Sequence, residues 1–328
     1  MTRKAIVVGS AGQDGQLLSA QLRRRGFEVL GCVRPSETAT SSSNQTTIDI
    51  CAGDPVAALV KGFRPDEIYF LAAYHHSAEE GGYVFAEILR RSLDVHSVAL
   101  VNFLDAAALH APAARLFYAA SSHVFGRPAD GVQDERTPIN PVSAYGISKA
   151  AGLFACRHYR ETHGLFASVG ILYNHESELR AEKFLSRKIA RGVAAVLHGE
   201  AKGLTLGNLD TVVDWGYAPD YTEAMQKILE AASPGDFVIA SGKPHTVRDF
   251  ARIAFESVGL NYADHVKSDP SIVNRDAGLL VGDPTLLTTT TGWRPTVDFS
   301  EMVRRLVAHE ISAKDAPDRA ANLSKASR

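Results

Sequence analysis

Short apolar runs alternate with longer amphipathic segments along the first half of the chain. The runs 4–9, 28–34, 48–50, 67–73, 114–121 and 166–173 are apolar and of strand length, and each predicts a strand. The segments 15–26, 55–63, 85–109 and 143–164 carry apolar residues at helical spacing. Strands that alternate with helices of this length predict an α/β fold, a doubly wound parallel sheet of the Rossmann type.

The pattern changes after residue 173, where polar segments and short strands replace the regular alternation. We expect a smaller C-terminal substrate-binding lobe over 174–211 and 241–312. Segments near 212–240, with a helix over 221–232 and a strand over 236–241, are expected to return to the domain formed by 1–173. Residues 313–328 lack apolar periodicity, and we expect a mobile tail there.

Composition narrows the classes of partner. The 328 residues carry a formal net charge of -2, so no global field favours nucleic acid or an anionic membrane. The three cysteines are widely spaced, which predicts neither a disulfide framework nor a metal site and favours a cytoplasmic protein. The strand pattern begins within a few residues of Met1, so we expect no signal peptide. No run approaches the roughly 20 apolar residues that span a bilayer, so we expect no membrane insertion.

The stretch GSAGQDG, residues 9–15, follows the first strand and opens a helix. Gly9 permits a tight turn, Gly12 lets the backbone approach a pyrophosphate, and Gly15 allows close packing of helix and strand. This context predicts a dinucleotide site; the alternative is a glycine turn without a ligand.

The end of the second strand indicates which dinucleotide binds. Sites for NAD usually place an acid there, whereas this chain has Arg34 and Ser36, which suit the 2′-phosphate of NADP. If Arg34 is only an exposed loop residue, NAD is the alternative cofactor. Asp49 is placed to cap the adenine side or to form a turn. The other expected cofactor contacts in this half are Gln13, Asp14, Ile50, Leu71, Ala72 and Ala73.

Tyr145 and Lys149 are four residues apart and share one face of the predicted helix. A lysine ammonium beside a phenol favours the phenolate, so we expect Lys149 to lower the pKa of Tyr145. The same ammonium can hold a nicotinamide ribose. Ser121 ends the preceding strand, and with the glycine motif before it the three residues predict a Ser/Tyr/Lys catalytic triad.

These motifs make the chain similar to extended short-chain dehydrogenases/reductases, and it resembles more narrowly the GDP-mannose 4,6-dehydratase family. The likeness extends from GSAGQDG through SAYGISKAAG, NHES, SRKI and LGNLD to LLVGDP. It implies an NADP cofactor and a C-terminal lobe that holds a nucleotide-linked sugar, with a GDP-linked hexose as substrate.

The resemblance also implies a reaction. In that family the tyrosine takes the proton of the sugar C4 hydroxyl as hydride leaves C4; water is then eliminated from C5 and C6, and the hydride returns to C6. A glutamate two residues after the threonine of the triad serves the elimination. Here Ser121 matches that threonine, Ser122 the next residue, and His123 the glutamate. Histidine can replace the carboxylate as acid or base, or it can only contact the sugar. His75 and His76 are alternative proton carriers.

The resemblance further assigns the residues that hold both nucleotides. His175 and Arg180 are expected at the cofactor. The expected substrate contacts are Asn174, Glu176, Lys183, Arg187, Lys188, Asn208 and Arg275, with Asn274 as a substitute for Arg275. Val213 stands where the family commonly has an arginine, so one phosphate contact is expected to be missing. The alternative for Arg187 and Lys188 is that they lie on a solvent-exposed helix face and bind no ligand.

Two other functions stay open from the residues alone. One is a 4-ketosugar reductase, 4-dehydrogenase or 4-epimerase, which needs only the triad; the other is a catalytically silent NADP(H)-binding sensor. The resemblance implies a homodimer or homotetramer paired through helices 85–109 and 145–163. Val98, Val101, Leu104, Leu153 and Phe154 are the candidates for that surface, and core burial is the alternative for each. Relatives usually have a second arginine at the position of Pro35, in the loop after the second strand. We therefore do not expect this loop to join subunits into a larger assembly.

Overall fold

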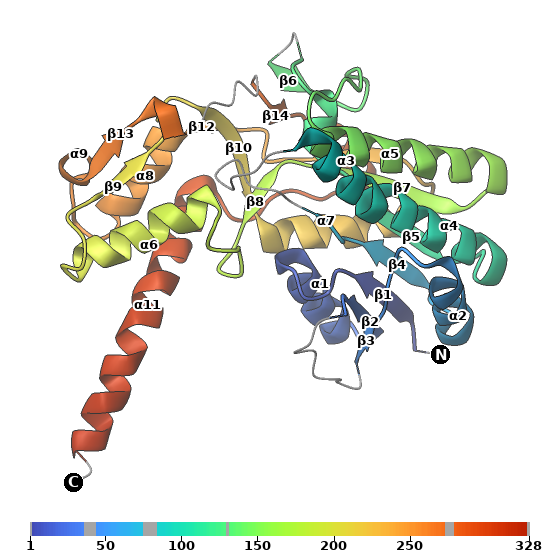
Figure 1. Ribbon diagram of the computed structural model, residues 1–328, viewed down its shortest axis with the longest axis horizontal. Helices are drawn as coiled ribbons and strands as arrows, with labels where there is room; N and C mark the ends of the chain where they lie inside the picture. Colours follow the sequence, from blue (N-terminus) through green and yellow to red (C-terminus); the bar gives the residue numbers. More distant parts are fainter. Residues whose placement is uncertain (1, 36–43, 75–83, 129–130, 273–278, 327–328) are drawn as a thin grey trace.

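A seven-stranded parallel sheet forms the centre of the protein, in the order β11-β7-β5-β4-β1-β2-β3 (Figure 1). The computed structural model describes residues 2–35, 44–74, 84–128, 131–272 and 279–326. The strands of the sheet are β1 (Lys4–Val8), β2 (Glu28–Val33), β3 (Gln45–Thr47), β4 (Glu67–Phe70), β5 (Arg115–Ala119), β7 (Phe166–Leu172) and β11 (Asp236–Ile239). All neighbours pair in parallel, which confirms the predicted Rossmann-type fold.

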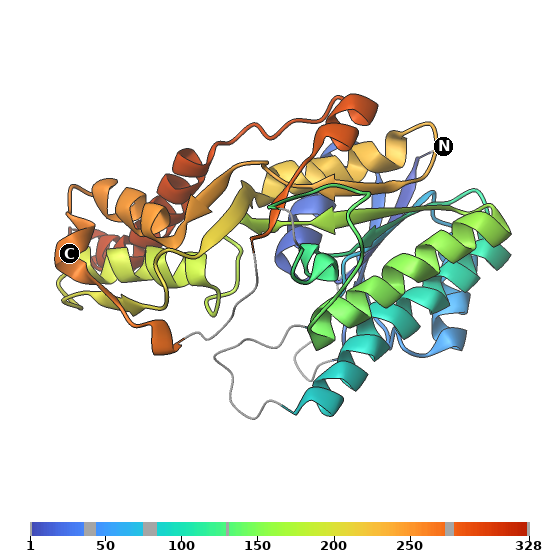
Figure 2. The same ribbon diagram turned by 90° about the horizontal axis from the view of Figure 1, so that it is seen from above.

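Helices cover both faces of this sheet (Figure 2). They are α1 (Gln13–Arg24), α2 (Gly53–Phe63), α3 (Phe85–Leu93), α4 (Ala99–His110), α5 (Ala144–His163) and α7 (Ala218–Glu230). Successive residues of β1 enter different cores: Ile6 packs with α2, α4 and α5, and Val7 packs with α1 and α7. A strand buried on both faces has to be apolar throughout, which is why these strands appear as unbroken apolar runs.

The second lobe has a hydrophobic core of its own, which includes Ile189, Phe250 and Leu306. Its elements are β8 (Asn174–Glu176), α6 (Leu185–Leu197), β9 (Leu204–Leu206), β10 (Val212–Tyr217), β12 (Pro244–Thr246), α8 (Val247–Glu256), α9 (Tyr262–His265), β13 (Val266–Ser268) and α11 (Phe299–Ala326). The short elements β6 (Val132–Gln133), β14 (Val281–Gly282) and α10 (Thr285–Thr291) complete the chain, with 3-10 turns at Ser122–Phe125 and Pro270–Ile272.

Several boundaries differ from the predicted ones. The strand expected at 48–50 is β3 at Gln45–Thr47, because the Asp49 side chain accepts the Cys51 N–H at 3.0 Å and turns the chain there. β10 pairs with β8 and β12 in a separate sheet, so the returning segment begins at α7. Trp293, placed in the lobe by sequence, joins the core beside α7 and donates its indole N–H to the Asp220 carbonyl.

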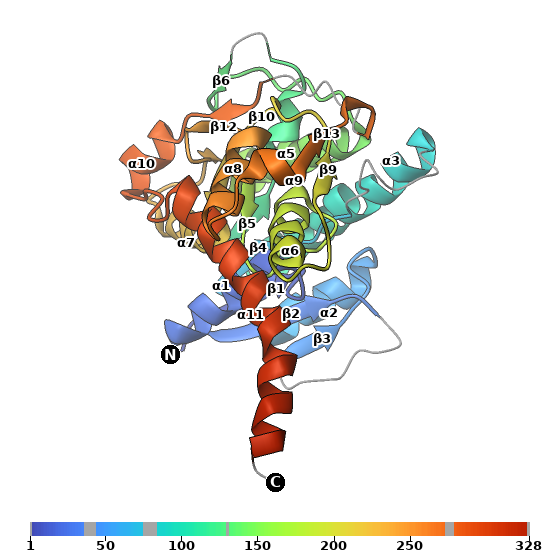
Figure 3. The same cartoon turned by 90° about the vertical axis from the view of Figure 1, so that its left-hand side faces the viewer.

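The C-terminal segment is helical. Residues 313–326 continue α11, which extends away from the rest of the molecule in Figures 1 and 3. The backbone therefore has a regular structure where the sequence pattern predicted a mobile tail; its mobility stays a prediction. The first turns of α11 place Met302 and Leu306 in the core of the second lobe.

The helical run Phe85–His110 is long and apolar enough to cross a membrane, the one such run in the described chain. The prediction that no run reaches this length was therefore wrong by this measure. Phe103 and Leu104 are fully buried in the core between sheet and helices, which is the position of a core helix. Burial also removes Leu104 and Leu153 from the expected pairing surface, whereas Val98 and Phe154 are about half exposed, at 47% and 50%.

Candidate active site

A cleft of about 770 Å³ opens at the carboxyl ends of the parallel strands, where ligands bind in folds of this type. It brings together most of the predicted site residues. Its walls include Gly9, Gly12, Gln13, Asp14, Gly15, Arg34, Asp49, Ile50, Leu71, Ala72, Ala73, Ser121, His123, Tyr145, Lys149, Asn174, His175 and Arg180. Ser36, His75, His76, Asn274 and Arg275 lie outside the described residues.

The glycine turn is built as the sequence predicted. Gly9 has φ +88°, and a Cβ on Gly15 would lie 2.3 Å from the Gly9 carbonyl oxygen, so both positions exclude other residues. At Gly12 a Cβ would meet no protein atom nearer than 3.4 Å, so the fold itself does not require this glycine. Helix α1 has no side-chain cap, which leaves its N-terminal N–H groups to face the cleft. This end of the cleft therefore fits a pyrophosphate, and the site fits a dinucleotide.

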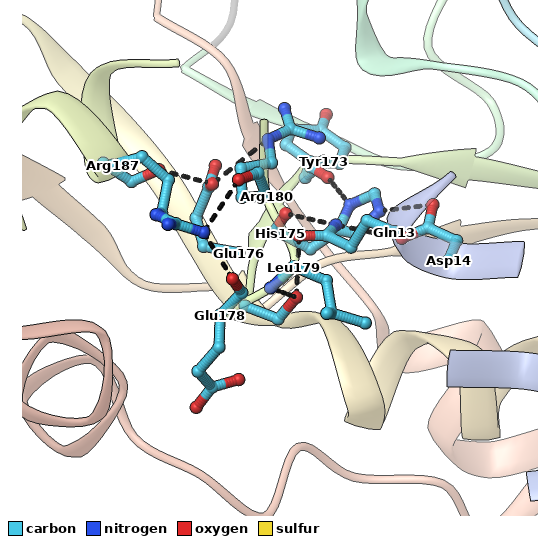
Figure 4. Close-up of polar contacts among 11 residues, drawn as sticks. Gln13, Asp14, Tyr173, His175, Glu176, Glu178, Leu179, Arg180 and Arg187 are labelled. Atoms are coloured by element: carbon cyan, nitrogen blue, oxygen red, sulfur yellow. Dashed lines mark hydrogen bonds and ion pairs between the residues drawn. The ribbon is translucent and has the colours of Figure 1, made fainter. Parts of the chain in front are cut away.

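Behind the glycine turn, Asp14 forms an ion pair with His175 of β8 (Figure 4). The Asp14 carboxylate lies 2.9 Å from Nε2 of His175, while Nδ1 donates to the Tyr173 carbonyl at 2.7 Å. Gln13 strengthens the contact, because its amide donates to Asp14 and to the His175 carbonyl and accepts the Ser177 hydroxyl. These bonds join the cofactor turn to the second lobe.

Both members of the pair are shifted toward their charged forms. Burial opposes ionisation of Asp14, but the charge and hydrogen bond of His175 lower the pKa of Asp14 to about 2. Burial likewise lowers the pKa of His175, but Asp14 outweighs it and raises the pKa above its usual value. Both ring nitrogens of His175 face acceptors, as a protonated imidazole requires.

At the other end of the cleft, Arg34 and Asp49 lie exposed beyond β2 and β3. The Asp49 side chain accepts the Cys51 N–H, so the turn interpretation of this residue holds, and it also lines the cleft. Arg34 lines the cleft just beyond β2, where a guanidinium can meet a phosphate.

The triad residues meet in the middle of the cleft. Ser121 caps the 3-10 turn after β5, and its hydroxyl accepts the His123 N–H at 3.3 Å. Tyr145 and Lys149 come from the first turns of α5, which Ser143 caps through the Gly146 N–H. Lys149 is 2% exposed, and its ammonium donates to the Ala119 carbonyl at 2.7 Å.

The expectation that Lys149 lowers the pKa of Tyr145 is wrong for this structure. Burial raises the pKa of Tyr145 to about 12, although the charge of Arg180 and a hydrogen bond with Ser121 act to lower it. Burial also lowers the pKa of Lys149 to about 7, against the charge of Asp14. Lys149 is thus only partly charged at neutral pH, and its ammonium lies 5.7 Å from the centre of the tyrosine ring.

Two histidines contact the Tyr145 ring edge-on. His123 lies with its ring centre 5.7 Å from that of Tyr145, and the two planes are at 86°. His96, which the sequence analysis did not single out, lies on the π-helical turn Asp94–Val98 at 5.2 Å and also at 86°. The helical run 85–109 carries several other polar residues, so the pair His96 and Ser97 gave no distinct signal in the sequence.

The expected substrate residues divide into two groups. Asn174 is exposed on the cleft wall. Ser122, Glu176, Lys183, Arg187, Lys188 and Asn208 lie outside the cleft wall. Glu176 is buried, accepts the Ser186 hydroxyl at 2.6 Å and lies 3.2 Å from Nε of Arg180. Arg187 is also buried and pairs with Glu310 of α11. It also donates to the backbone carbonyls of Glu178 and Arg180 (Figure 4), so its described partners are structural.

The family model for GDP-mannose 4,6-dehydratase matches residues 6–306. GDP-mannose 4,6 dehydratase 1 of Arabidopsis thaliana is 34% identical, covering 94% of this chain and 89% of the relative. Two solved structures share the fold. RMD from Pseudomonas aeruginosa complexed with NADPH has a TM-score of 0.78 and 20% sequence identity, and the match covers 95% of this chain and 100% of that one. The dTDP-glucose 4,6-dehydratase from Bacillus anthracis in complex with NAD has a TM-score of 0.80 and 18% identity, and the match covers 96% of this chain and 98% of that one. The chain therefore belongs to the GDP-mannose 4,6-dehydratase family.

Proposed function

We propose that this protein is an NADP-dependent 4,6-dehydratase acting on a GDP-linked hexose. The observation that carries the proposal is the meeting of Ser121, Tyr145 and Lys149 beside a glycine turn, in a chain of this family. The curated relative is a GDP-mannose 4,6-dehydratase, which supports a GDP-sugar.

For the cofactor, we propose NADP because Arg34 lines the cleft just beyond β2, where the adenine ribose would lie, and no carboxylate precedes it at the end of that strand. One structural neighbour carries NADPH and another NAD, so the fold itself accommodates either dinucleotide. When bound, NADP would supply the acceptor for the hydride from the sugar C4 and its donor to C6. The residues that would hold the cofactor are the glycine turn, Arg34, Lys149 and Arg180.

The residues of this chain divide the proton chemistry. Tyr145 takes the proton of the C4 hydroxyl, and the Ser121 hydroxyl holds the same oxygen. Because burial disfavours the phenolate, the proton has to leave Tyr145 with help from charges nearby, and Arg180 supplies one that already lowers the pKa of Tyr145. Lys149 supplies a second positive charge, because an anionic dinucleotide in the cleft raises the pKa of its amine and so increases the protonated fraction.

For the elimination, we propose that His123 replaces the family's glutamate. Among the described residues of the cleft wall the carboxylates are Asp14 and Asp49; Asp14 is paired with His175, and Asp49 lies beyond β3 at the adenine end. His123 is on the same turn as Ser121 and contacts Tyr145, which supports a role for it as the acid or base of the elimination.

The reaction products test these assignments. Incubation with GDP-mannose and other nucleotide sugars in deuterated water should give a 4-keto-6-deoxy sugar, with deuterium at C5 and no net change in NADPH. His123→Ala should keep oxidation at C4 and lose deuterium incorporation, whereas Tyr145→Phe should lose both. Net NADPH consumption or inversion at C4 would instead support a reductase or epimerase. If none of the nucleotide sugars is turned over, the remaining hypothesis is the catalytically silent NADP(H)-binding sensor.

We also propose a cytoplasmic homodimer, or a homotetramer built from it. Val98 and Phe154 expose apolar surface on the helices that the resemblance assigns to subunit pairing, and Leu109 is 74% exposed on α4. Light scattering coupled to size exclusion measures the mass directly. Phe154→Asp should shift a dimer to the monomer; an unchanged mass would place the interface elsewhere.

A further inference from the structure

The helical run beside the catalytic helix contains a π-helical turn at Asp94–Val98, between α3 and α4. Such turns add one residue to a helix and are frequent at functional sites. Here the turn directs two consecutive polar side chains, His96 and Ser97, onto α5. Ser97 donates its hydroxyl to the Ser148 carbonyl at 3.0 Å, one turn after Tyr145.

His96 is fully buried and connects two walls of the site. Its Nε2 accepts the backbone N–H of Tyr74, a residue of the cleft wall after β4, at 2.9 Å. Its Nδ1 lies 2.7 Å from the Ser148 hydroxyl, which donates to the Tyr145 carbonyl at 2.9 Å.

These contacts fix the protonation of the ring. A backbone N–H can only donate, so Nε2 has to be the unprotonated nitrogen. The proton of a neutral imidazole is then on Nδ1, where it is donated to the Ser148 hydroxyl, and that hydroxyl passes its own hydrogen to Tyr145. The hydrogen bonds therefore form a relay in which the Tyr74 N–H donates to His96, His96 donates to the Ser148 hydroxyl, and that hydroxyl donates to the Tyr145 carbonyl.

The same imidazole also limits the orientation of the tyrosine. The His96 ring lies edge-on to the Tyr145 ring with centres 5.2 Å apart. The backbone of Tyr145 is held through Ser148 and its ring through this contact, so one side chain acts on both.

We propose that His96 is a positioning residue for Tyr145: it holds the catalytic tyrosine, through Ser148 and by ring contact, in register with the cleft wall at Tyr74. The proposal rests on the role given above to Tyr145. It predicts a loss in turnover rather than in substrate binding, because misplacing a reacting group by about 1 Å can cost on the order of a hundredfold in rate.

Three variants separate hydrogen bonding from packing. His96→Phe keeps a planar ring and loses the described hydrogen bonds to Tyr74 and Ser148; His96→Gln keeps an acceptor and a donor but loses the ring. Ser148→Ala interrupts the relay and leaves the Tyr74 contact. His110→Gln is the matched control, since His110 ends α4 and lies outside the cleft wall.

Turnover of the sugar nucleotide should fall about tenfold in Ser148→Ala and up to about a hundredfold in His96→Phe, with KM for the sugar nucleotide unchanged. His96→Gln should retain more activity than His96→Phe, and the control should match the parent protein. The proposal is overturned if His96→Phe is more active than His96→Gln, or if His96→Phe, His96→Gln and Ser148→Ala all turn over like the parent protein.

A second measurement does not depend on turnover, so it separates this proposal from the proposed function. Nitrogen NMR of the ligand-free parent protein at neutral pH should show His96 as the neutral tautomer protonated on Nδ1, with a proton contact between the His96 and Tyr145 rings. That contact should weaken in Ser148→Ala. A His96 protonated on Nε2 would refute the relay even if the dehydratase reaction is confirmed. The expected signals in a protein without turnover would uphold the positioning and reject the proposed function.

Discussion

The ion pair between Asp14 and His175 is predicted to stabilise the fold in a defined pH range. The carboxylate is 21% exposed and the imidazole 10%, so solvent screens the pair only in part. A pKa of about 2 for Asp14, against 3.8 for the unperturbed group, corresponds to roughly 2 kcal/mol of stabilisation at neutral pH. Asp14→Asn removes the charge with little change in shape, and His175 then lacks the partner that keeps it protonated.

The pH dependence has a definite sign at each end. The pKa of Asp14 is lowered by folding, so its contribution is complete above the unfolded value of about 4 and is lost as the pH falls towards 2. The pKa of His175 is raised, so its contribution is complete below about 6.5 and is lost as the pH rises through the raised value. The parent protein should therefore exceed Asp14→Asn in stability most clearly between these limits.

Urea unfolding at a series of pH values measures the difference. We expect Asp14→Asn to be less stable by roughly 2 kcal/mol between about pH 4 and 6.5, with the two curves converging at lower pH. NMR titration of His175 should show its pKa dropping below the usual value, because burial and the charge of Arg180 are then opposed only by the hydrogen bond to the Tyr173 carbonyl. Asp49→Asn, in the same cleft but exposed, is the control. Equal stability of Asp14→Asn and the parent, or an unchanged His175 titration, would refute the reasoning.

Three further predictions concern other parts of the site. Gly15→Ala should destabilise the protein by about 1–3 kcal/mol because its Cβ meets the Gly9 carbonyl, whereas Gly12→Ala should keep the melting temperature and weaken cofactor binding; calorimetry and titration distinguish the two. Cofactor binding above pH 7 should take up a proton, since an anionic dinucleotide raises the Lys149 pKa from about 7; calorimetry in buffers of different ionisation enthalpy detects it, and Lys149→Met should abolish it. Arg187→Ala leaves buried Glu310 without its partner and should cost about 3 kcal/mol of stability at unchanged KM; a raised KM with full stability would restore the predicted substrate role.

Local patterns predicted the fold because each depends on neighbours in sequence. The apolar run around Ile6, the spacing of Gly9 and Gly15, and the helical spacing of Tyr145 and Lys149 all appear in the structure as expected. The ends of elements were less predictable, since a single side-chain contact such as that of Asp49 decides where β3 stops.

The electrostatics of the site depended on contacts that sequence spacing does not encode. Asp14 and His175 are separated by 161 positions, and nothing in either segment indicates that they pair. The same limit explains the wrong expectation for Tyr145. Spacing placed Lys149 nearby, but burial, which is a property of the whole fold, raises the pKa of Tyr145 and lowers that of Lys149. His96 was missed for the same reason, because its partners Tyr74 and Ser148 come from two other elements.

The turn that carries His123 explains how its side chain can differ from the family's glutamate without disturbing the triad. The backbone at this position is fixed independently of the side chain: its N–H is held by Ser121, and its carbonyl accepts the Gly126 N–H at 3.3 Å. A Cβ on Gly146 would lie 2.5 Å from that carbonyl, so α5 packs directly against the turn and sets the distance to Tyr145. A carboxylate or an imidazole at 123 therefore starts from the same backbone position. Under the proposed mechanism, exchange there would alter the elimination step and leave the arrangement of Ser121, Tyr145 and Lys149 unchanged.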